Sequence, residues 1–396
     1  MYSFETEKNT TIEMLLELNI LPADRQKVEK NYPFFDKQLL SLIDYITIRD
    51  LLQLGGYRDD PNLFALLMLM FRLTGEGSLC LNLEKENLNT CLESFTDTET
   101  AEKIGGIILA ALGKNRWDRL ISRNGDRYLP LVFRDLENRK LLYFQKYFAH
   151  EMSLASRLQI LLANSQPPRE KEQPNQTVVD YEEPAPITGN KGVLKEIIEA
   201  LYSESLTLRV SDGKKPIVKD PIQVRALELS AASRFSIISG GPGTGKTSLM
   251  VNILRCLIRT GTDPDKILIC APTGRAAQRM SEAVTKNIST IISPSAEDLA
   301  LLNLKGATLH KALRFNTHTN RFYYNAQNPL PVSAAIVDEV SMVDVVMMNR
   351  FLAAVDPSAT RVIFLGDKDQ LPSVEAGAVL SHMIPEDTRS ENFKKA

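Results

Sequence analysis

The chain has 396 residues, of which 43% are hydrophobic and 24% are charged, and its formal net charge at pH 7 is −2. A chain of this length can form two or three globular domains, and its composition is that of an ordinary folded protein. The nearly neutral charge excludes a polyanion-binding surface that covers the whole molecule, so any nucleic-acid site must be a local basic surface.

The cysteines and apolar runs exclude several other classes of protein. Cys80, Cys91, Cys256 and Cys270 form no CxxC pair, and with four histidines in the chain there is no zinc-ligand spacing. Dispersed cysteines are typical of a reducing compartment. The N-terminus lacks the basic start and apolar core of a signal peptide, and the apolar runs are too short to span a bilayer. We therefore predict a cytoplasmic protein with no membrane segment.

Residues 1–165 are predicted to form a mainly helical domain with some strand. Apolar residues recur at spacings of three and four in 34–54, which indicates amphipathic helices, and residues 62–73 are typical of a core helix. Residues 75–83 alternate like a strand after a glycine turn. The remaining segments are interpreted as a strand at 127–135 and a short strand followed by a helix at 140–163.

Residues 166–190 are predicted to be a proline-rich linker. The stretch QPPREKEQPNQTVVDYEEPAP holds five prolines and few apolar residues. An ordered proline-rich arm that lies on a partner is the alternative interpretation.

Residues 191–385 alternate between strands and helices. A helix is predicted from residue 191, and Asp220 and Pro221 suit the start of another. This alternation predicts an α/β fold with a parallel, doubly wound sheet, in which ligands bind at the carboxyl ends of the strands. The predicted strands are residues 234–239, 266–271, 334–337 and 361–366.

The stretch GGPGTGKT follows the first of these strands and precedes a helix, which is the context that a phosphate-binding loop requires. Glycines let the backbone direct several N–H groups at a phosphate. Lys246 is expected to contact the β and γ phosphates of ATP, and the hydroxyl of Thr247 to ligate Mg²⁺. The predicted nucleotide-binding residues of the loop are Gly240, Gly241, Pro242, Gly243, Thr244, Gly245, Lys246 and Thr247.

Two further strand ends carry groups suited to ATP hydrolysis. In IVDEVSM, Asp338 suits Mg²⁺ held through water, and Glu339 is placed to activate the attacking water. In FLGDKDQLPSVEAG, the neutral amide of Gln370 can hydrogen-bond the γ-phosphate or the water without competing for Mg²⁺. The alternative for both stretches is an ordinary polar turn that ends a strand.

Three segments offer contacts to a phosphate backbone. Thr273 and Arg275 lie at a predicted helix start in APTGRAA, and GATLHKAL offers Thr308 and His310 in a similar way. Each is alternatively a plain helix cap. Residues 311–335 contain no acid and interleave basic with aromatic residues around an NTHTN turn, which suits single-stranded nucleic acid. A surface hairpin with a buried aromatic face fits that pattern equally.

Taken in order, the motifs GGPGTGKT, APTGRAA, TLH, VDEVSM and GDKDQLPSVEAG resemble those of superfamily 1 DNA helicases. Within that superfamily the chain is most similar to the RecD family, the α subunits of bacterial exodeoxyribonuclease V (RecBCD). The likeness covers most of residues 60–385. It includes GEGSLCLNL, LPLVFRDLENRKLLYFQKYFAHE and NPLPVSAAIVDEVSMVDVVMM.

The resemblance implies that residues 191–385 form a RecA-like P-loop NTPase domain. It also implies a 5′→3′ DNA helicase subunit that uses ATP and Mg²⁺ and works in double-strand break repair and recombination beside RecB and RecC. By matching motifs, Gln223 is expected to contact adenine and Gln370 to couple cleavage to movement. The four residues Thr273, Arg275, Thr308 and His310 are expected to touch the DNA backbone. The N-terminal domain, 1–165, is expected to dock on RecC.

Members of the RecD family continue into a second RecA-like domain that supplies an arginine to the phosphates. No such motifs follow here, and residues 386–396 read as a polar tail. We therefore expect this polypeptide alone to bind ATP and hydrolyse it slowly, unless a second polypeptide supplies that half. The alternatives are a non-motor ATP-binding or RecC-docking remnant and a stand-alone RecD-like helicase. The latter is disfavoured because residues 104–114 match a helix-hairpin-helix motif poorly.

Overall fold

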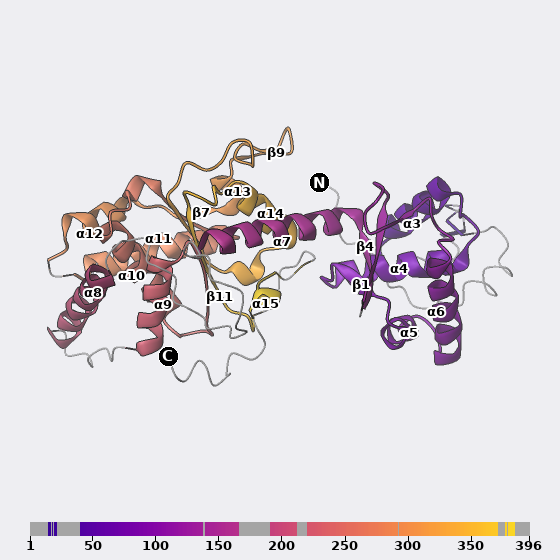
Figure 1. The fold of residues 1–396 in the computed structure, drawn as a ribbon, viewed down its shortest axis with the longest axis horizontal. Coiled ribbons are helices and arrows are strands. Elements are labelled where there is room, and N and C mark those ends of the chain that lie inside the picture. Colours follow the sequence, from indigo (N-terminus) through magenta and orange to yellow (C-terminus); the bar gives the residue numbers. More distant parts are fainter. Residues whose placement is uncertain are drawn as a thin grey trace, which may run out of the picture. The chain divides into compact units, whose positions relative to one another are not determined.

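The computed structural model forms two compact units, residues 1–152 with 374–377 and residues 153–373 with 378–396. Figure 1 shows the fold of each. The structure describes residues 15–16, 18, 20–21, 40–137, 139–165, 191–211, 220–291, 293–370, 377 and 379–384. The predicted linker and the polar tail lie outside the described residues. Among the described helices, none has both the length and the apolar content that crossing a bilayer requires.

The first unit packs helices against a small mixed sheet. The helices are α3 (Leu42–Gly55), α4 (Pro61–Gly75), α5 (Lys85–Glu93) and α6 (Thr98–Gly113). The strands are β1 (Cys80–Asn82), β2 (Ile121–Arg123), β3 (Leu131–Leu136) and β4 (Arg139–Phe144), in the order β1-β4-β3-β2. Helix α7 (Gln145–Ser165) begins in this unit and ends in the second.

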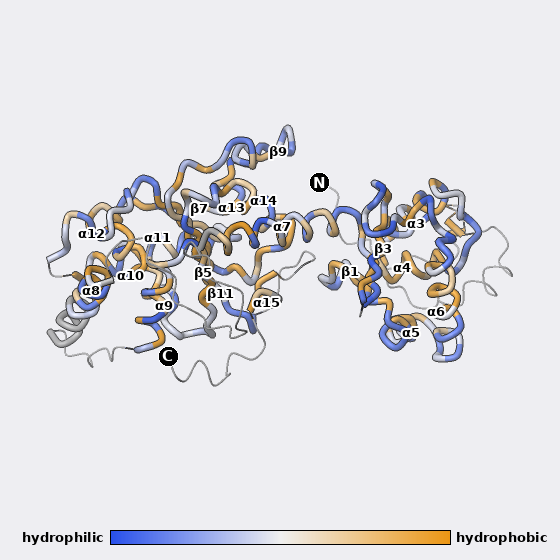
Figure 2. Tube along the Cα trace, in the orientation of Figure 1, coloured by the Kyte–Doolittle hydropathy of each residue, from blue (hydrophilic) through white to orange (hydrophobic). Residues whose placement is uncertain are grey.

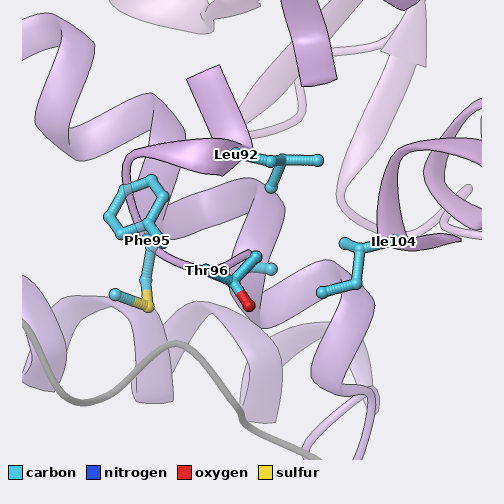
Figure 3. Close-up of a pocket in the computed structure, with 6 residues that line it drawn as sticks. Leu92, Phe95, Thr96 and Ile104 are labelled. Atoms are coloured by element: carbon cyan, nitrogen blue, oxygen red, sulfur yellow. The ribbon is translucent and has the colours of Figure 1, made fainter. Parts of the chain in front are cut away.

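Helix α4 is the core of the first unit, as its nearly all-apolar sequence predicts. Every side chain from Leu63 to Met70 is buried, and Figure 2 shows hydrophobic residues along this helix. The helix begins at Asp60, whose carboxylate accepts the N–H groups of Asn62 and Leu63 and the indole N–H of Trp117. A small, mostly apolar hollow lies beside α4 (Figure 3), lined by Ala65, Met68, Leu92, Phe95, Thr96 and Ile104.

The second unit is built on a five-stranded parallel sheet, which confirms the predicted fold class. Its strands are β5 (Phe235–Ser239), β6 (Ile267–Ala271), β7 (Ala307–Thr308), β10 (Ala334–Val337) and β11 (Arg361–Gly366), in the order β5-β11-β10-β6-β7. The short strand β7, which pairs with β6, was not predicted from the sequence. Two residues are too few to show the alternation that marks a strand.

Helices and short turns of 3₁₀ helix connect these strands. The α-helices are α8 (Lys191–Ser211), α9 (Pro221–Ala232), α10 (Lys246–Arg259), α11 (Gly274–Ser289), α12 (Ala296–Ala300), α13 (Leu309–Ala312), α14 (Val345–Ala353) and α15 (Val379–Met383). The 3₁₀ turns are η1 (Pro264–Lys266), η2 (Leu301–Asn303) and η3 (Val340–Met342). Strands β8 (Phe315–Asn316) and β9 (Arg321–Phe322) form a separate antiparallel hairpin, which projects from the unit in Figure 1.

The central strands of the parallel sheet, β6, β10 and β11, are buried on both faces, and successive strand residues point to opposite sides. Ile336 and Ile363 belong to the same apolar cluster as residues of α8 to α11. On the other face Phe364 packs against Phe351 of α14, with ring centroids 6.2 Å apart. Because both faces are covered, the strands read as continuous apolar runs rather than as alternating ones.

An ion-paired cluster anchors α10, the helix that follows the predicted phosphate loop. The carboxylate of Asp298 on α12 is fully buried and accepts two bonds of 2.9 Å from Arg255 and one of 2.8 Å from Arg259. Burial acts to raise the pKa of Asp298, but the hydrogen bonds and charge of the two arginines outweigh it and lower the pKa below its usual 3.8. The cluster therefore depends on an ionised carboxylate.

Substituting Asp298→Ala is expected to lower the free energy of unfolding by about 3–5 kcal/mol at pH 7, because it removes the buried carboxylate that forms ion pairs with Arg255 and Arg259. A lowered carboxyl pKa contributes stability above the unfolded pKa of 3.8, and this contribution is lost as the pH falls through the folded pKa. The penalty should therefore shrink in acid. Urea unfolding at pH 7 and pH 3 measures it, with exposed Glu297→Ala as the matched control; equal stability of the two variants would contradict the prediction.

Candidate nucleotide site

The order of the parallel strands brings three predicted motifs to one edge of the sheet. Strand β11 pairs with β5 on one side and with β10 on the other. The N–H of Gly240, after β5, donates to the carbonyl of Gly366, the last residue of β11, at 3.1 Å. The N–H of Asp338, after β10, donates to the carbonyl of Cys270 in β6 at 2.9 Å. The segments after these strands therefore start side by side.

The phosphate loop takes a backbone path that depends on glycine. Gly243 and Gly245 have φ angles of 76° and 85°, in the left-handed region that L-residues with a side chain rarely adopt. The hydroxyl of Thr244 closes the loop by donating to the carbonyl of Gly241 at 2.9 Å. Helix α10 starts directly after Gly245, and no side chain caps it. Its first N–H groups and its positive dipole end are thus left for an anion.

The Lys246 side chain lies across this loop. Its ammonium group donates to the carbonyls of Gly240 and Gly241. An ammonium held by backbone carbonyls can exchange these bonds for phosphate oxygens at the same loop. Thr247, one residue further on, is exposed, and its hydroxyl has no hydrogen-bond partner within the described part of the chain. Both groups are therefore placed to contact a nucleotide and its metal ion, and the donor set fits Mg²⁺-ATP.

Asp338 is a half-buried carboxylate beside the loop. Burial raises its pKa above the usual 3.8, while the N–H of Glu339, which it accepts at 2.8 Å, and the positive charge of Lys246 act in the opposite direction. The positive charge of Lys246 thus acts on this carboxylate. A desolvated carboxylate near a phosphate loop gains from binding a divalent cation, which restores a countercharge.

Glu339 has an unusual backbone conformation. Its φ and ψ angles are 53° and 40°, in the left-handed region, although it carries a side chain. Such residues cost about 1–3 kcal/mol and occur at functional sites more often than elsewhere. The carboxylate is partly exposed and lies 3.8 Å from the guanidinium of Arg279. The structure thus leaves the carboxylate accessible to water, as an activating base requires.

Gln370 lies in the turn that follows β11. Its N–H donates to the carbonyl of Asp367 at 3.3 Å, and the N–H of Lys368, earlier in the same turn, donates to the hydroxyl of Ser239, the last residue of β5, at 3.4 Å. Asp367 itself is buried and accepts the N–H of Asp369. The turn is thereby held next to the start of the phosphate loop, with the Gln370 side chain exposed.

Gln223 lies on α9, which precedes the phosphate loop in the sequence, and its side chain contacts that loop. Its side-chain amide donates to the carbonyl of Thr244 at 3.0 Å. A Cβ atom on Gly245 would stand 3.0 Å from the same amide nitrogen, so the loop passes close to Gln223. The amide is thus at the rim of the phosphate loop, where a nucleotide base could meet it.

Of the four predicted DNA contacts, two cap helices, one is an exposed arginine and one, His310, packs in an aromatic cluster. The hydroxyls of Thr273 and Thr308 accept the N–H groups of Ala276 and Lys311, each at 3.2 Å, and so cap α11 and α13. Each capping hydroxyl still has its own proton to donate to a phosphate. Arg275 is exposed and makes no ion pair within the described part of the chain.

His310 does not stand free, since its ring belongs to an aromatic cluster at the base of the hairpin. Its centroid is 5.5 Å from that of Phe315 and 5.8 Å from that of Phe322, and the two phenyl rings are 4.7 Å apart. The guanidinium of Arg350, on α14, lies 4.8 Å from the Phe322 centroid. The two phenylalanines therefore secure the hairpin to the body of the unit.

Of the two tyrosines that follow the hairpin, Tyr323 is exposed and Tyr324 is half-buried. Tyr323 is 58% exposed, and the guanidinium of Arg314 lies over the rings of both Tyr323 and Tyr324, 5.5 and 5.3 Å from their centroids. Figure 2 shows hydrophilic residues around β9. The basic and aromatic pattern thus contains both features that the sequence left open, a packed aromatic face and an exposed one.

The sequence reasoning missed Arg279 as part of this site. It lies one turn after Arg275 on α11 and contacts Glu339, 60 residues away along the chain. The only signal in the sequence is a second arginine at i+4 in APTGRAAQR, which any exposed helix face can carry.

Substituting Lys246→Gln is expected to weaken nucleotide binding about tenfold to hundredfold, because it removes a charged hydrogen-bond donor to the phosphates. Titration with a fluorescent ATP analogue measures this change. Lys266→Gln, at an exposed lysine just before β6, is the matched control and should bind as the unaltered chain does. Equal affinity in both variants would show that the loop does not bind nucleotide.

Substituting Asp338→Asn is expected to stabilise the fold at pH 7 and yet weaken Mg²⁺-dependent nucleotide binding. A raised folded pKa means that the ionised carboxylate costs stability above that pKa and costs nothing below the unfolded value of 3.8. The amide has no such cost, so its advantage in thermal melting should vanish in acid. A variant that is destabilised at pH 7, or whose nucleotide affinity still responds to Mg²⁺ as before, would contradict this role.

Comparison with known proteins gives the same assignment for this unit. Residues 223–376 match a family model described as an AAA domain. The chain is 38% identical over 174 residues to the RecBCD enzyme subunit RecD of Haemophilus influenzae, which is 43% of this chain and 27% of that protein. It is 40% identical over 167 residues to the subunit of the same name from Mycobacterium tuberculosis, 41% of this chain and 28% of that protein.

A third relative is named as a RecD2 helicase. The chain is 35% identical over 158 residues, 40% of its length, to the ATP-dependent RecD2 DNA helicase of Deinococcus radiodurans, of which the match covers 19%. These matches span about a fifth to a quarter of the length of the relatives. The resemblance to RecD drawn from the motifs is confirmed for this region: residues 223–376 match the AAA domain, a P-loop NTPase, and the chain is similar to RecD proteins over about 40% of its length.

Proposed function

We propose that this chain provides an ATP-driven motor domain of a 5′→3′ DNA helicase of the RecD kind. The observation that carries the proposal is that three strand ends meet at one edge of the sheet. Strand β11 lies between β5, which is followed by the phosphate loop, and β10, which is followed by the acidic pair. An NTPase that merely binds nucleotide needs the loop and the acids. The added amide of Gln370 on the middle strand supplies a group that responds to the γ-phosphate.

The residues have distinct roles in this proposal. The uncapped N-terminus of α10 and the Lys246 ammonium bind the phosphates, and Thr247 and Asp338 hold the metal ion. Bound Mg²⁺ neutralises the charge that develops on the phosphates during cleavage. Glu339 orients and deprotonates the attacking water, and Gln370 hydrogen-bonds whichever of γ-phosphate or water is present. The turn that carries Gln370 then changes its contacts when the phosphate leaves.

The DNA path runs over the same edge of the sheet, beside β6 and β7. These strands pair so that Thr308 lies opposite Ala271, two residues before Thr273. The two capping hydroxyls are therefore neighbours, and each can donate to a backbone phosphate while it caps its helix. Arg275 adds a free cation. The outward Tyr323, stacked against Arg314, offers a face for an unpaired base.

We further propose that the chain works as a subunit beside RecB and RecC in the repair and recombination of broken DNA in the cytoplasm, with the first unit docking on RecC. The names of two similar proteins, RecBCD enzyme subunit RecD, support this. So do the highly exposed apolar side chains of this unit, Ile43, Leu54 and Tyr128, at 71%, 75% and 90% exposure. Helix α6 runs unbroken over residues 98–113, so the segment compared above with a helix-hairpin-helix motif contains no hairpin up to residue 113.

A motor requires that nucleotide and DNA binding influence each other. Fluorescein-labelled oligothymidylate is titrated with the chain in Mg²⁺, with and without a non-hydrolysable ATP analogue. We expect the DNA affinity to differ about fivefold or more between the two conditions, the usual range for coupled sites. Lys246→Gln should bind DNA equally in both conditions at an analogue concentration that just saturates the unaltered chain, since its weaker nucleotide affinity leaves it mostly empty there.

Two results would contradict the proposal. If the analogue binds but the DNA affinity does not change, the chain is a nucleotide-binding module without a motor function. If neither single-stranded nor duplex oligonucleotide binds, the second unit is not a DNA motor domain.

A further inference from the structure

One exposed face of α11 carries two arginines of different surroundings. Arg275 and Arg279 are four residues apart, so they lie on the same side of the helix, one turn from each other. Both are exposed, whereas the opposite face is buried in the apolar cluster of the unit. The buried residues of the helix are Ala276, Ala277, Met280, Val284 and Ile288.

The second of these arginines contacts the proposed water-activating residue. A guanidinium nitrogen of Arg279 lies 3.8 Å from a carboxylate oxygen of Glu339, and the side chains are 60% and 29% exposed. The neighbouring polar pair on this face, Gln278 and Glu282, is bonded to itself at 2.8 Å. Within the described part of the chain, Glu339 is the one carboxylate paired with Arg279.

The ion pair between Arg279 and Glu339 is weak enough for Arg279 to exchange it for another partner. A partly exposed ion pair at this distance changes an equilibrium constant by no more than about fivefold. A backbone phosphate offers a guanidinium two oxygens with matching geometry, which makes it the stronger partner. A phosphate that reaches Arg275 would be within about one helical turn, or ~5 Å along the axis, of Arg279.

The backbone conformation of Glu339 determines what changes when its ion pair with Arg279 is broken. Its left-handed conformation follows directly on Asp338, whose carboxylate holds the Glu339 N–H at 2.8 Å. The main chain at this position is therefore fixed, and a change at Glu339 is a change in where its side chain lies. A guanidinium on α11 can hold that side chain, and its removal frees the carboxylate to meet the water.

We propose that Arg279 is a positioning residue that holds Glu339 against α11 in the absence of DNA and releases it when a DNA phosphate takes the guanidinium. This inference rests on the proposed function. It makes α11 the element that couples the DNA path to the hydrolytic centre. By the reciprocity of linked sites, removing the negative charge of Glu339 frees Arg279 and strengthens DNA binding.

A double-mutant cycle on DNA affinity tests this without any need for turnover. Glu339→Gln, Arg279→Gln and the double variant of the 396-residue chain are titrated against labelled oligothymidylate in Mg²⁺ without nucleotide, over a range of salt concentrations. We expect Glu339→Gln to bind about two- to fivefold more tightly than the unaltered chain. That gain should be absent in the Arg279→Gln background, and Arg279→Gln should reduce the salt slope by about one.

Two controls separate the contact from general electrostatics. Lys286→Gln removes an exposed positive charge from the same helix, and in that background Glu339→Gln should keep its gain in affinity. Arg279→Lys keeps the charge and should restore part of the coupling. Thermal melting checks that each variant is folded. If the ion pair had only a structural role, its removal would lower the melting temperature and leave the salt slope of DNA binding unchanged.

The outcomes are distinguishable. If the chain binds DNA but Glu339→Gln gains the same affinity with and without Arg279, the inference is wrong and the proposed function stands. If no variant binds DNA, the proposed function fails and the inference falls with it. If Glu339→Gln gains DNA affinity in the unaltered chain and in the Lys286→Gln background, but not in the Arg279→Gln background, the coupling is established.

Discussion

The structure depends on one constraint, the position of β11 between β5 and β10 in the parallel sheet. Because parallel strands share a direction, their carboxyl ends lie at one edge, and the central strand fixes what stands on either side of it. The bond from the Gly240 N–H to the Gly366 carbonyl ties the phosphate loop to the turn that carries Gln370. A different strand order would leave the same motifs intact in sequence and separate them in space.

Helix α10 starts directly after the phosphate loop and carries groups that we propose bind the phosphates of a nucleotide. At its start no side chain caps it, so its N–H groups remain for an anion. Further along, Arg255 and Arg259 hold the buried carboxylate of Asp298. A helix that offers an uncompensated dipole end to a ligand is stabilised elsewhere by packing and ion pairing. Binding strength at one end and structural stability along the rest are thus supplied by different residues of one helix.

Several residues combine a structural and a chemical property that sequence reasoning had set against each other. Thr273 and Thr308 cap helices through their lone pairs and keep a proton to donate. The hairpin packs Phe322 inward against Arg350 and exposes Tyr323. A threonine hydroxyl can cap a helix and donate to a ligand because the two functions use different atoms. Likewise, the aromatic residues of the hairpin can pack on one face and remain exposed on the other.

The sequence by itself determined the local chemistry: glycines that permit the loop, a lysine at the helix start, acids and an amide directly after apolar runs, and the bounds of β10 and β11. These follow from residue type and spacing, because they depend on neighbours within a few positions. Only the tertiary structure decided the strand order, the two-residue strand β7 and the meeting of Arg279 with Glu339. Such features depend on residues far apart in the chain, and no local pattern encodes which strand lies beside which.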